Sequence, residues 1–187
     1  MQDAAYSKMA NAIRNDQTPN FFGLHYDAEE WVVRNVVLIP RFVLSLSALH
    51  KRKALSPQAE RHGWVGCDIL LRAIPQEARI PLVVEGTVRK PKEVREHFDS
   101  LRGLARRGVE ARGWVMDVWR VVQDIRMGEF SLPDVYAAES SLARLHPDNR
   151  HIRAKIRQQL QILRDLGVVR FLGGGRYGRQ WRVKNGE

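Results

Sequence analysis

The chain has 187 residues, a formal net charge of +10, 44% hydrophobic residues and one cysteine. This hydrophobic content is enough for a packed core, which excludes a disordered chain, and the single Cys67 excludes an internal disulfide and a multi-cysteine zinc site within this sequence. No run of about eighteen apolar residues predicts a membrane span, and we expect a cytoplasmic protein.

The first half of the chain predicts a mixture of helix and strand. A helix is expected over residues 4–13, and strands over residues 20–26, 31–39 and 80–84. Between them, residues 51–53 and 60–67 predict basic loops, the second of which carries Trp64.

A charge-rich stretch over residues 90–112 predicts a linker or an exposed helix. We place a boundary near Gly108, which gives units of residues 1–108 and 109–187. The second unit begins with an apolar helix from Trp114 to about residue 125. A second helix starts at Ser131, where the spacing to Asp134 is that of a capping box, and ends before Pro147.

A third helix follows Pro147 and has two different faces. Ile152, Ile156, Leu160 and Leu163 recur on an apolar face, whereas the polar face carries Arg150, Arg153, Arg157, Gln161 and Arg164. Asp148 or Asn149 can cap its start, and Gly167 suits its end.

Two short apolar segments, residues 168–172 and 180–183, then predict a hairpin joined by a flexible turn over residues 173–179. Three helices followed by such a wing define a winged helix-turn-helix. The predicted fold class is therefore α+β, with an α/β unit followed by a C-terminal winged helix-turn-helix domain.

Positive charge is concentrated at the C-terminal end. Residues 148–187 hold ten basic and three acidic residues, a net +7 of the chain's +10. Such a local excess is what phosphate neutralisation requires, so double-stranded DNA is the expected partner. The alternative is an ordinary solvated charged helix.

The candidate DNA-binding residues lie in three segments. Trp64 is a candidate wedge between base steps, with core packing as the alternative, and Asn149 is equally suited to capping. Trp31, Trp114 and Trp119 are expected in the core. The remaining candidates on the third helix and the wing are Arg150, His151, Arg153, Lys155, Arg157, Gln158, Gln161, Arg176, Tyr177 and Arg179.

Four segments carry a family resemblance: PNFF at residues 19–22, RHGWVGC at 61–67, RGW at 112–114 and HIRAKIRQQLQILRD at 151–165. They resemble the Dam-replacing family of methyl-directed restriction endonucleases, over essentially the whole chain. The resemblance implies a PD-(D/E)xK nuclease domain, with Mg²⁺ and a zinc site, joined to a C-terminal winged helix. Both domains would read adenine-methylated GATC.

The family's catalytic and zinc-binding motifs lie upstream of the segment that matches residues 4–6, so the first unit resembles only a partial nuclease domain. Neither Pro133-Asp134 nor Pro147-Asp148 is followed by a suitable Glu-x-Lys. Glu29, Glu30, Asp68 and Glu85 also form no such motif. No catalytic residue, metal ligand or cofactor is therefore assigned to this chain.

Three functions fit the sequence. The first is a monomeric DNA-binding protein of this family that recognises adenine-methylated GATC and lacks the catalytic motif. The second is an active type II endonuclease whose N-terminal catalytic part lies outside this sequence. The third is a winged-helix regulator.

Overall fold

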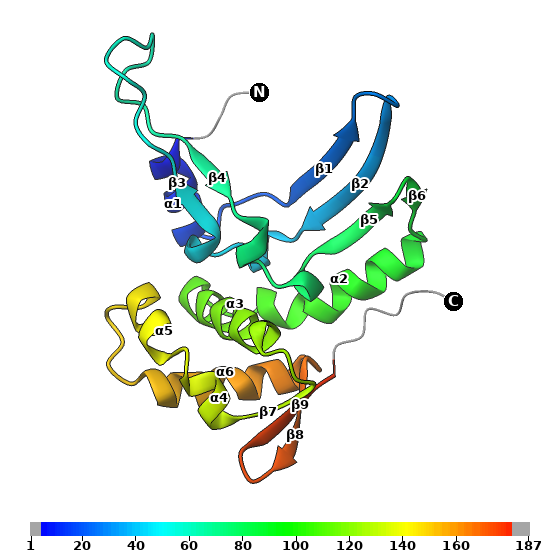
Figure 1. Cartoon of the computed structure of the whole chain (residues 1–187), viewed down its shortest axis with the longest axis vertical. Helices are drawn as coiled ribbons and strands as arrows, with labels where there is room; N and C mark the ends of the chain where they lie inside the picture. Colours follow the sequence, from blue (N-terminus) through cyan, green and yellow to red (C-terminus); the bar gives the residue numbers. More distant parts are fainter. Residues whose placement is uncertain (1–4, 181–187) are drawn as a thin grey trace.

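The computed structural model describes residues 5–180 and places one helix, α3 (Val109–Asp124), between two layers of structure. Strands of the first half lie above α3, and the remaining helices of the second half lie below it (Figure 1). α3 contacts α1 (Tyr6–Arg14), η1 (Arg41–Val43) and η2 (Leu46–Ala48) of the first half. It also contacts α4 (Leu132–Tyr136) and α6 (Ile152–Asp165) of the second half. Because Trp114 and Trp119 on α3 are almost completely buried, this helix is part of a shared core.

The first half is built on a four-stranded antiparallel sheet in the order β1-β2-β5-β6. The predicted first helix and the three predicted strands are confirmed. The elements of this half are α1 (Tyr6–Arg14), β1 (Phe21–Asp27), β2 (Val32–Ile39), η1 (Arg41–Val43), η2 (Leu46–Ala48), β3 (Leu49–Lys51), β4 (Cys67–Ile69), η3 (Leu71–Ala73), η4 (Gln76–Ala78), β5 (Ile80–Val84), β6 (Thr87–Val88) and α2 (Pro91–Ala105).

The charged stretch before α3 forms the helix α2, which packs on β5. Pro91 stands in its first turn, where a missing N–H costs no hydrogen bond. Leu101 and Leu104 are fully buried, and Val94 and Phe98 pack against the same core. Of the two predicted alternatives the helix is therefore right, although one of its faces is buried.

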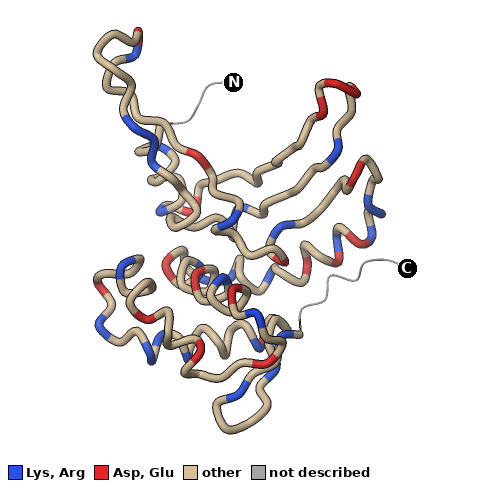
Figure 2. The backbone as a smooth tube through the Cα atoms, in the orientation of Figure 1, with Lys and Arg blue, Asp and Glu red and all other residues tan. Residues whose placement is uncertain are grey.

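The outer edge of the sheet is unusually apolar. β1 is the edge strand, and Phe22 and Leu24 on it are 64% and 66% exposed. Trp31 is 81% exposed, so its predicted place in the core is wrong. It lies in the β1–β2 turn with a φ of 56°, and at this tip acidic residues gather (Figure 2).

The second half has the winged-helix order of elements, which confirms the predicted fold class. Its sheet has the order β7-β9-β8. The predicted second helix is divided in two by a turn at Ala137 and Ala138. The elements are β7 (Glu129–Ser131), α4 (Leu132–Tyr136), α5 (Glu139–Leu145), α6 (Ile152–Asp165), β8 (Val169–Gly173) and β9 (Arg176–Arg179).

The capping box at the start of α4 is confirmed. Both the backbone N–H and the hydroxyl of Ser131 donate to Asp134 Oδ2 at 2.7 Å. These hydrogen bonds hold the pKa of the Asp134 carboxyl below its usual value. A three-residue spacing in the sequence is enough to predict this contact because it is local to one helical turn.

The wing differs from the prediction in its second strand. β8 turns through Gly174 and Gly175, both with positive φ, directly into β9. Two-residue turns of this kind suit the right-handed twist of a hairpin. The predicted flexible turn is therefore mostly strand, and of the predicted strand 180–183 all but Gln180 lies outside the described residues.

Candidate nucleic-acid interface

The helix α6 presents its apolar face to the core as predicted. Ile152, Ile156, Leu160 and Leu163 are all buried, and Gly167 ends the helix with a φ of 74°. Its start is different: the residue that precedes the first turn is His151, without a side-chain cap. Asn149 Oδ1 instead accepts a hydrogen bond from the His151 N–H at 2.8 Å, which shapes the turn before the helix.

The opposite face of α6 is open to solvent. Ala154, Arg157, Gln158 and Gln161 are exposed, and their spacing places them on one stripe of the helix. This stripe combines a guanidinium, two amides and one methyl side chain. These are the groups that recognise guanine, adenine and an apolar base substituent in a major groove.

Arg153 and Arg157 contact the preceding helices α4 and α5. Arg153 Nε donates to Glu139 Oε2 at 2.8 Å, and its guanidinium lies 5.2 Å from the centre of the Tyr136 ring. Arg157 Nη1 donates to the Tyr136 hydroxyl at 2.9 Å. Both arginines are exposed, yet Tyr136 and Glu139 already hold them in place in the DNA-free protein.

The other predicted DNA-binding residues of this segment, Lys155, Arg150 and His151, do not contact Tyr136 or Glu139 through any of the interactions described above. The Lys155 ammonium lies 5.9 Å from the centre of the Trp114 ring of α3. Arg150 and His151 are exposed in the turn that enters α6.

The three predicted contact residues of the wing are either paired or buried. Arg176 is exposed and pairs with Glu129 at 2.7 Å. Arg179 Nη2 donates to the backbone carbonyl of Met127 at 2.9 Å, which ties β9 to the segment between α3 and β7. Tyr177 was expected in a flexible turn, but it lies in β9, is buried and stacks on Phe130 with ring centres 5.6 Å apart.

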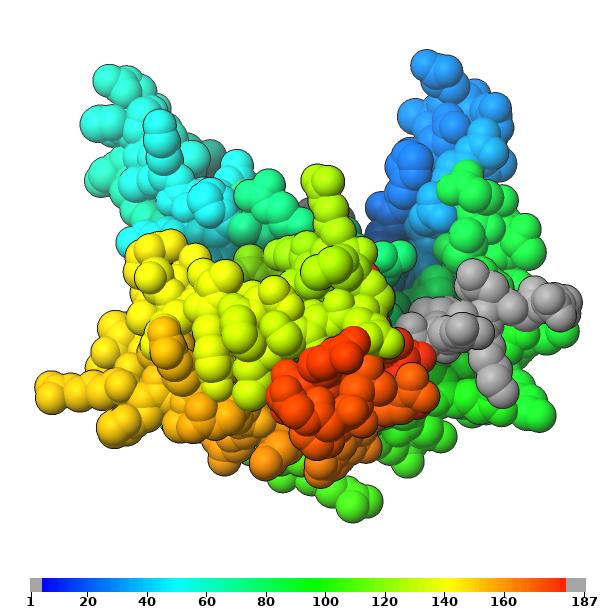
Figure 3. All heavy atoms as spheres, turned by 60° about the horizontal axis from the view of Figure 1, so that its bottom comes forward, coloured from blue at the N-terminus to red at the C-terminus, as the bar shows by residue number. Residues whose placement is uncertain are grey.

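Trp64 lies on a different part of the molecule from α6. Its loop, residues 52–66, projects from the β3–β4 hairpin at the opposite end from the wing (Figure 1). In Figure 3 this loop and the β1–β2 hairpin form two projections separated by a hollow. Trp64 is half-buried, and its ring lies so close to Gly66 that a Cβ added there would be 2.7 Å from it. The indole therefore packs within its own loop.

A model of the Dam-replacing family matches residues 1–107, and a model of the Dam-replacing HTH domain matches residues 110–179. The chain belongs to the Dam-replacing family. As a Dam-replacing protein with that family's helix-turn-helix domain, it is a DNA-binding protein related to restriction endonucleases.

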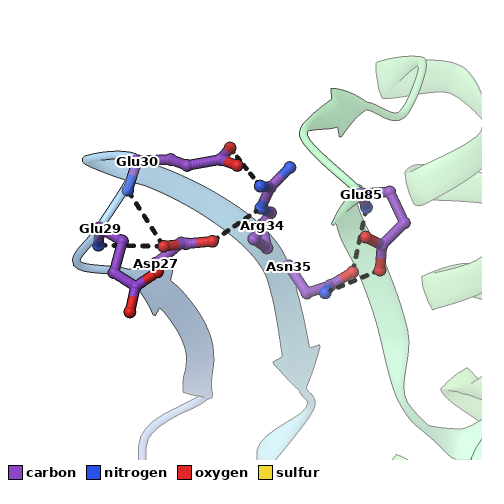
Figure 4. Close-up of polar contacts among 6 residues, drawn as sticks. All are labelled: Asp27, Glu29, Glu30, Arg34, Asn35 and Glu85. Atoms are coloured by element: carbon purple, nitrogen blue, oxygen red, sulfur yellow. Dashed lines mark hydrogen bonds and ion pairs between the residues drawn. The ribbon is translucent and has the colours of Figure 1, made fainter.

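The acidic residues of this Dam-replacing protein do not assemble a metal site within residues 5–180. Glu30 pairs with Arg34, and Asp27 Oδ1 accepts hydrogen bonds from the backbone of Glu29 and Glu30 (Figure 4). Glu85 exchanges hydrogen bonds with Asn35 on β2.

Over the same described range, no three His, Cys, Asp or Glu side chains come together in a way that could hold a metal ion. The residues of the described part therefore do not fit the Mg²⁺ and Zn²⁺ that the family implies. No helix in the described part is long and apolar enough to cross a membrane.

Tyr136 and Glu139 are the site residues that sequence analysis missed in this Dam-replacing protein. They belong to α4 and α5, whereas the arginines that they hold belong to α6. No spacing within one helix reveals such a contact, because it depends on how the helices pack.

Proposed function

We propose that this protein binds duplex DNA at adenine-methylated GATC by placing α6 in the major groove. The observation that carries the proposal is the exposed stripe of Ala154, Arg157, Gln158 and Gln161 on a helix whose other face is buried. Arg157 suits a guanine edge, and each glutamine amide suits an adenine edge. Arg150, His151, Lys155 and Arg176 then serve as phosphate contacts on either side.

The methyl group on adenine N6 requires an apolar neighbour in the groove. Ala154 meets this requirement, since it is exposed and lies one turn before Gln158 on the same stripe. A thymine methyl is recognised in the same manner by small apolar side chains. We therefore assign Ala154 to the methyl group and Gln158 to the adenine edge.

The test measures binding of the whole chain to short duplexes by fluorescence anisotropy. The duplexes carry methylated GATC, unmethylated GATC or no GATC, and salt is raised from about 50 to about 200 mM. The methylated site should bind tightest, and affinity should fall steeply with salt on every duplex. Equal affinity for methylated and unmethylated GATC would overturn the assignment of the site.

Substitutions then separate base reading by Arg157 from recognition of the methyl group by Ala154. Arg157→Ala should cost about 1–3 kcal/mol of binding free energy on methylated GATC. Ala154→Ser should reduce the preference for the methyl group while leaving affinity for unmethylated DNA nearly constant. Arg102→Ala, at an exposed position of α2, is the matched control for loss of one positive charge. If Arg102→Ala costs as much as Arg157→Ala, Arg157 does not read a base.

Cleavage is measured on the same material. Because the acidic residues of the described part form no two-carboxylate site, we propose that the chain binds methylated plasmid and leaves it uncut in Mg²⁺. Fragments cut at methylated GATC, retained through re-purification and abolished by EDTA, would contradict this.

A further inference from the structure

The carboxylate of Glu139 lies beside the surface that we assign to DNA. Glu139 Oε2 accepts a hydrogen bond from Arg153 Nε at 2.8 Å, and the two side chains are 36% and 62% exposed. Exposed pairs of this kind contribute little to the stability of the fold. The pair therefore adds little to folding stability, and we expect its effect in DNA binding instead.

Tyr136 extends this arrangement to the second arginine. Its ring lies under the Arg153 guanidinium, 5.2 Å from ring centre to carbon, and its hydroxyl accepts a hydrogen bond from Arg157 at 2.9 Å. One aromatic residue thus contacts both arginines while Glu139 neutralises the charge of Arg153. In the free protein, Arg153 is therefore paired with Glu139 although its side chain is exposed.

We propose that Glu139, supported by Tyr136, determines specificity by restraining Arg153 on DNA that lacks the correct site. This inference rests on the proposed function. Non-specific binding depends on phosphate neutralisation, and an arginine already paired with a carboxylate contributes little to it. The carboxylate also repels nearby phosphates. At the correct site, a base-edge contact for Arg153 compensates for loss of the Glu139 pair.

The decisive variant is Glu139→Gln in the full chain, which keeps the size of the side chain and removes its charge. Affinity for a duplex without GATC should rise roughly fivefold at about 0.1 M salt, because one more cation becomes available to phosphate. The slope of log affinity against log salt on that duplex should steepen by about 0.9. Affinity for methylated GATC should change less, so the ratio between the two duplexes should fall.

Asp99→Asn is the matched control. Asp99 Oδ1 pairs with Arg102 Nε at 2.8 Å on α2, and both side chains are exposed. The substitution changes the net charge by the same amount but far from α6 in the sequence and on another helix. It should shift binding to both duplexes equally and only slightly.

Tyr136→Phe tests the supporting residue. It keeps the ring beneath Arg153 and removes only the acceptor of the Arg157 hydrogen bond. The salt slope on DNA without GATC should stay near that of the unaltered protein, while affinity for methylated GATC falls because Arg157 is less well positioned. A steeper salt slope in Tyr136→Phe would overturn the division of roles between the two residues.

The outcomes separate this inference from the proposed function. If the unaltered protein does not distinguish methylated GATC from DNA without the site, both are overturned. If it does distinguish them and Glu139→Gln behaves like Asp99→Asn, only the role of Glu139 is overturned. A loss of affinity for methylated GATC in Glu139→Gln, with non-specific binding unchanged, would make Glu139 a residue that positions Arg153 for binding and would overturn the restraint.

Discussion

His146 and Asp117 form a hydrogen-bonded pair that ties the turn before α6 to the middle of α3. The distance from His146 Nε2 to Asp117 Oδ2 is 2.8 Å. The His146 ring stacks on Trp114, with ring centres 3.7 Å apart and planes within 14°. Asp117 is almost completely buried, and within the described residues its Oδ1 atom has no hydrogen-bond partner. His146 is thus the contact that compensates a costly buried carboxylate.

Replacing His146 should therefore destabilise the protein strongly. His146→Ala leaves the buried Asp117 without its imidazole partner and removes the ring stacked on Trp114. The expected loss is about 3–5 kcal/mol in the free energy of unfolding. Denaturant unfolding measures it, with His151→Ala at an exposed position as the control. Equal stability of the two variants would show that Asp117 does not depend on His146.

A second pair joins the turn after α1 to the start of α3 and makes stability depend on pH. Buried Arg112 donates to both carboxylate oxygens of Asp16, at 2.5 and 3.2 Å. Hydrogen bonding to Arg112 holds the pKa of Asp16 below its usual value. A lowered carboxylate pKa contributes stability above the unfolded value of about 4, and this contribution is lost as pH falls through the folded value.

Asp16→Asn tests this coupling without altering the backbone, because Asn tolerates the φ of 55° found at Asp16. The variant should be about 1–3 kcal/mol less stable at pH 7, since it leaves the Arg112 charge buried. Near pH 3 the difference should shrink. A stability difference that stays constant between pH 7 and pH 3 would contradict the role of the ionised carboxylate. Asp99→Asn is again the control.

The capping box stabilises the start of α4, the helix that carries Tyr136. Ser131→Ala removes the hydroxyl that donates to Asp134 and should cost about 1 kcal/mol of stability. Ser141→Ala, at an exposed hydroxyl on α5, should cost less. Thermal unfolding distinguishes them, and equal melting temperatures would argue that the box contributes nothing.

The apolar edge of the sheet predicts self-association at high concentration. An exposed edge strand with Phe22 and Leu24 offers unpaired backbone groups and apolar side chains. Leu24→Lys should raise the concentration at which light scattering detects aggregates, with little change in unfolding. Phe171→Lys, at an exposed position of the wing, should have a smaller effect. Unchanged aggregation in Leu24→Lys would assign it to another surface.

Separating the two halves should weaken the second one. A fragment of residues 109–187 keeps the predicted boundary but exposes the side of α3 that packs on α1, η1 and η2, and loses the Asp16 partner of Arg112. It should melt at a lower temperature than the full chain. A fragment as stable as the full chain would show that α3 needs only the winged helix. The DNA-binding experiments therefore use the whole chain.

Local patterns in the sequence were enough to predict much of this molecule. The apolar face of α6, the capping box at Ser131 and the positive φ of Gly167 all depend on residues within one or two helical turns. Basic charge near the C-terminus indicated the class of partner in the same way, because phosphate attraction depends on charge density alone.

Long-range packing decided the rest. Trp31 was expected in the core, but a turn at the sheet edge exposes it. Tyr177 was expected in a flexible, DNA-contacting turn, but pairing of β9 with β7 and β8 buries it. The contacts of Tyr136 with Arg153 and Arg157 also arise only when α4 lies against α6. Side-chain periodicity specifies which face of an element is apolar, but which partner covers that face depends on contacts between residues far apart in the chain.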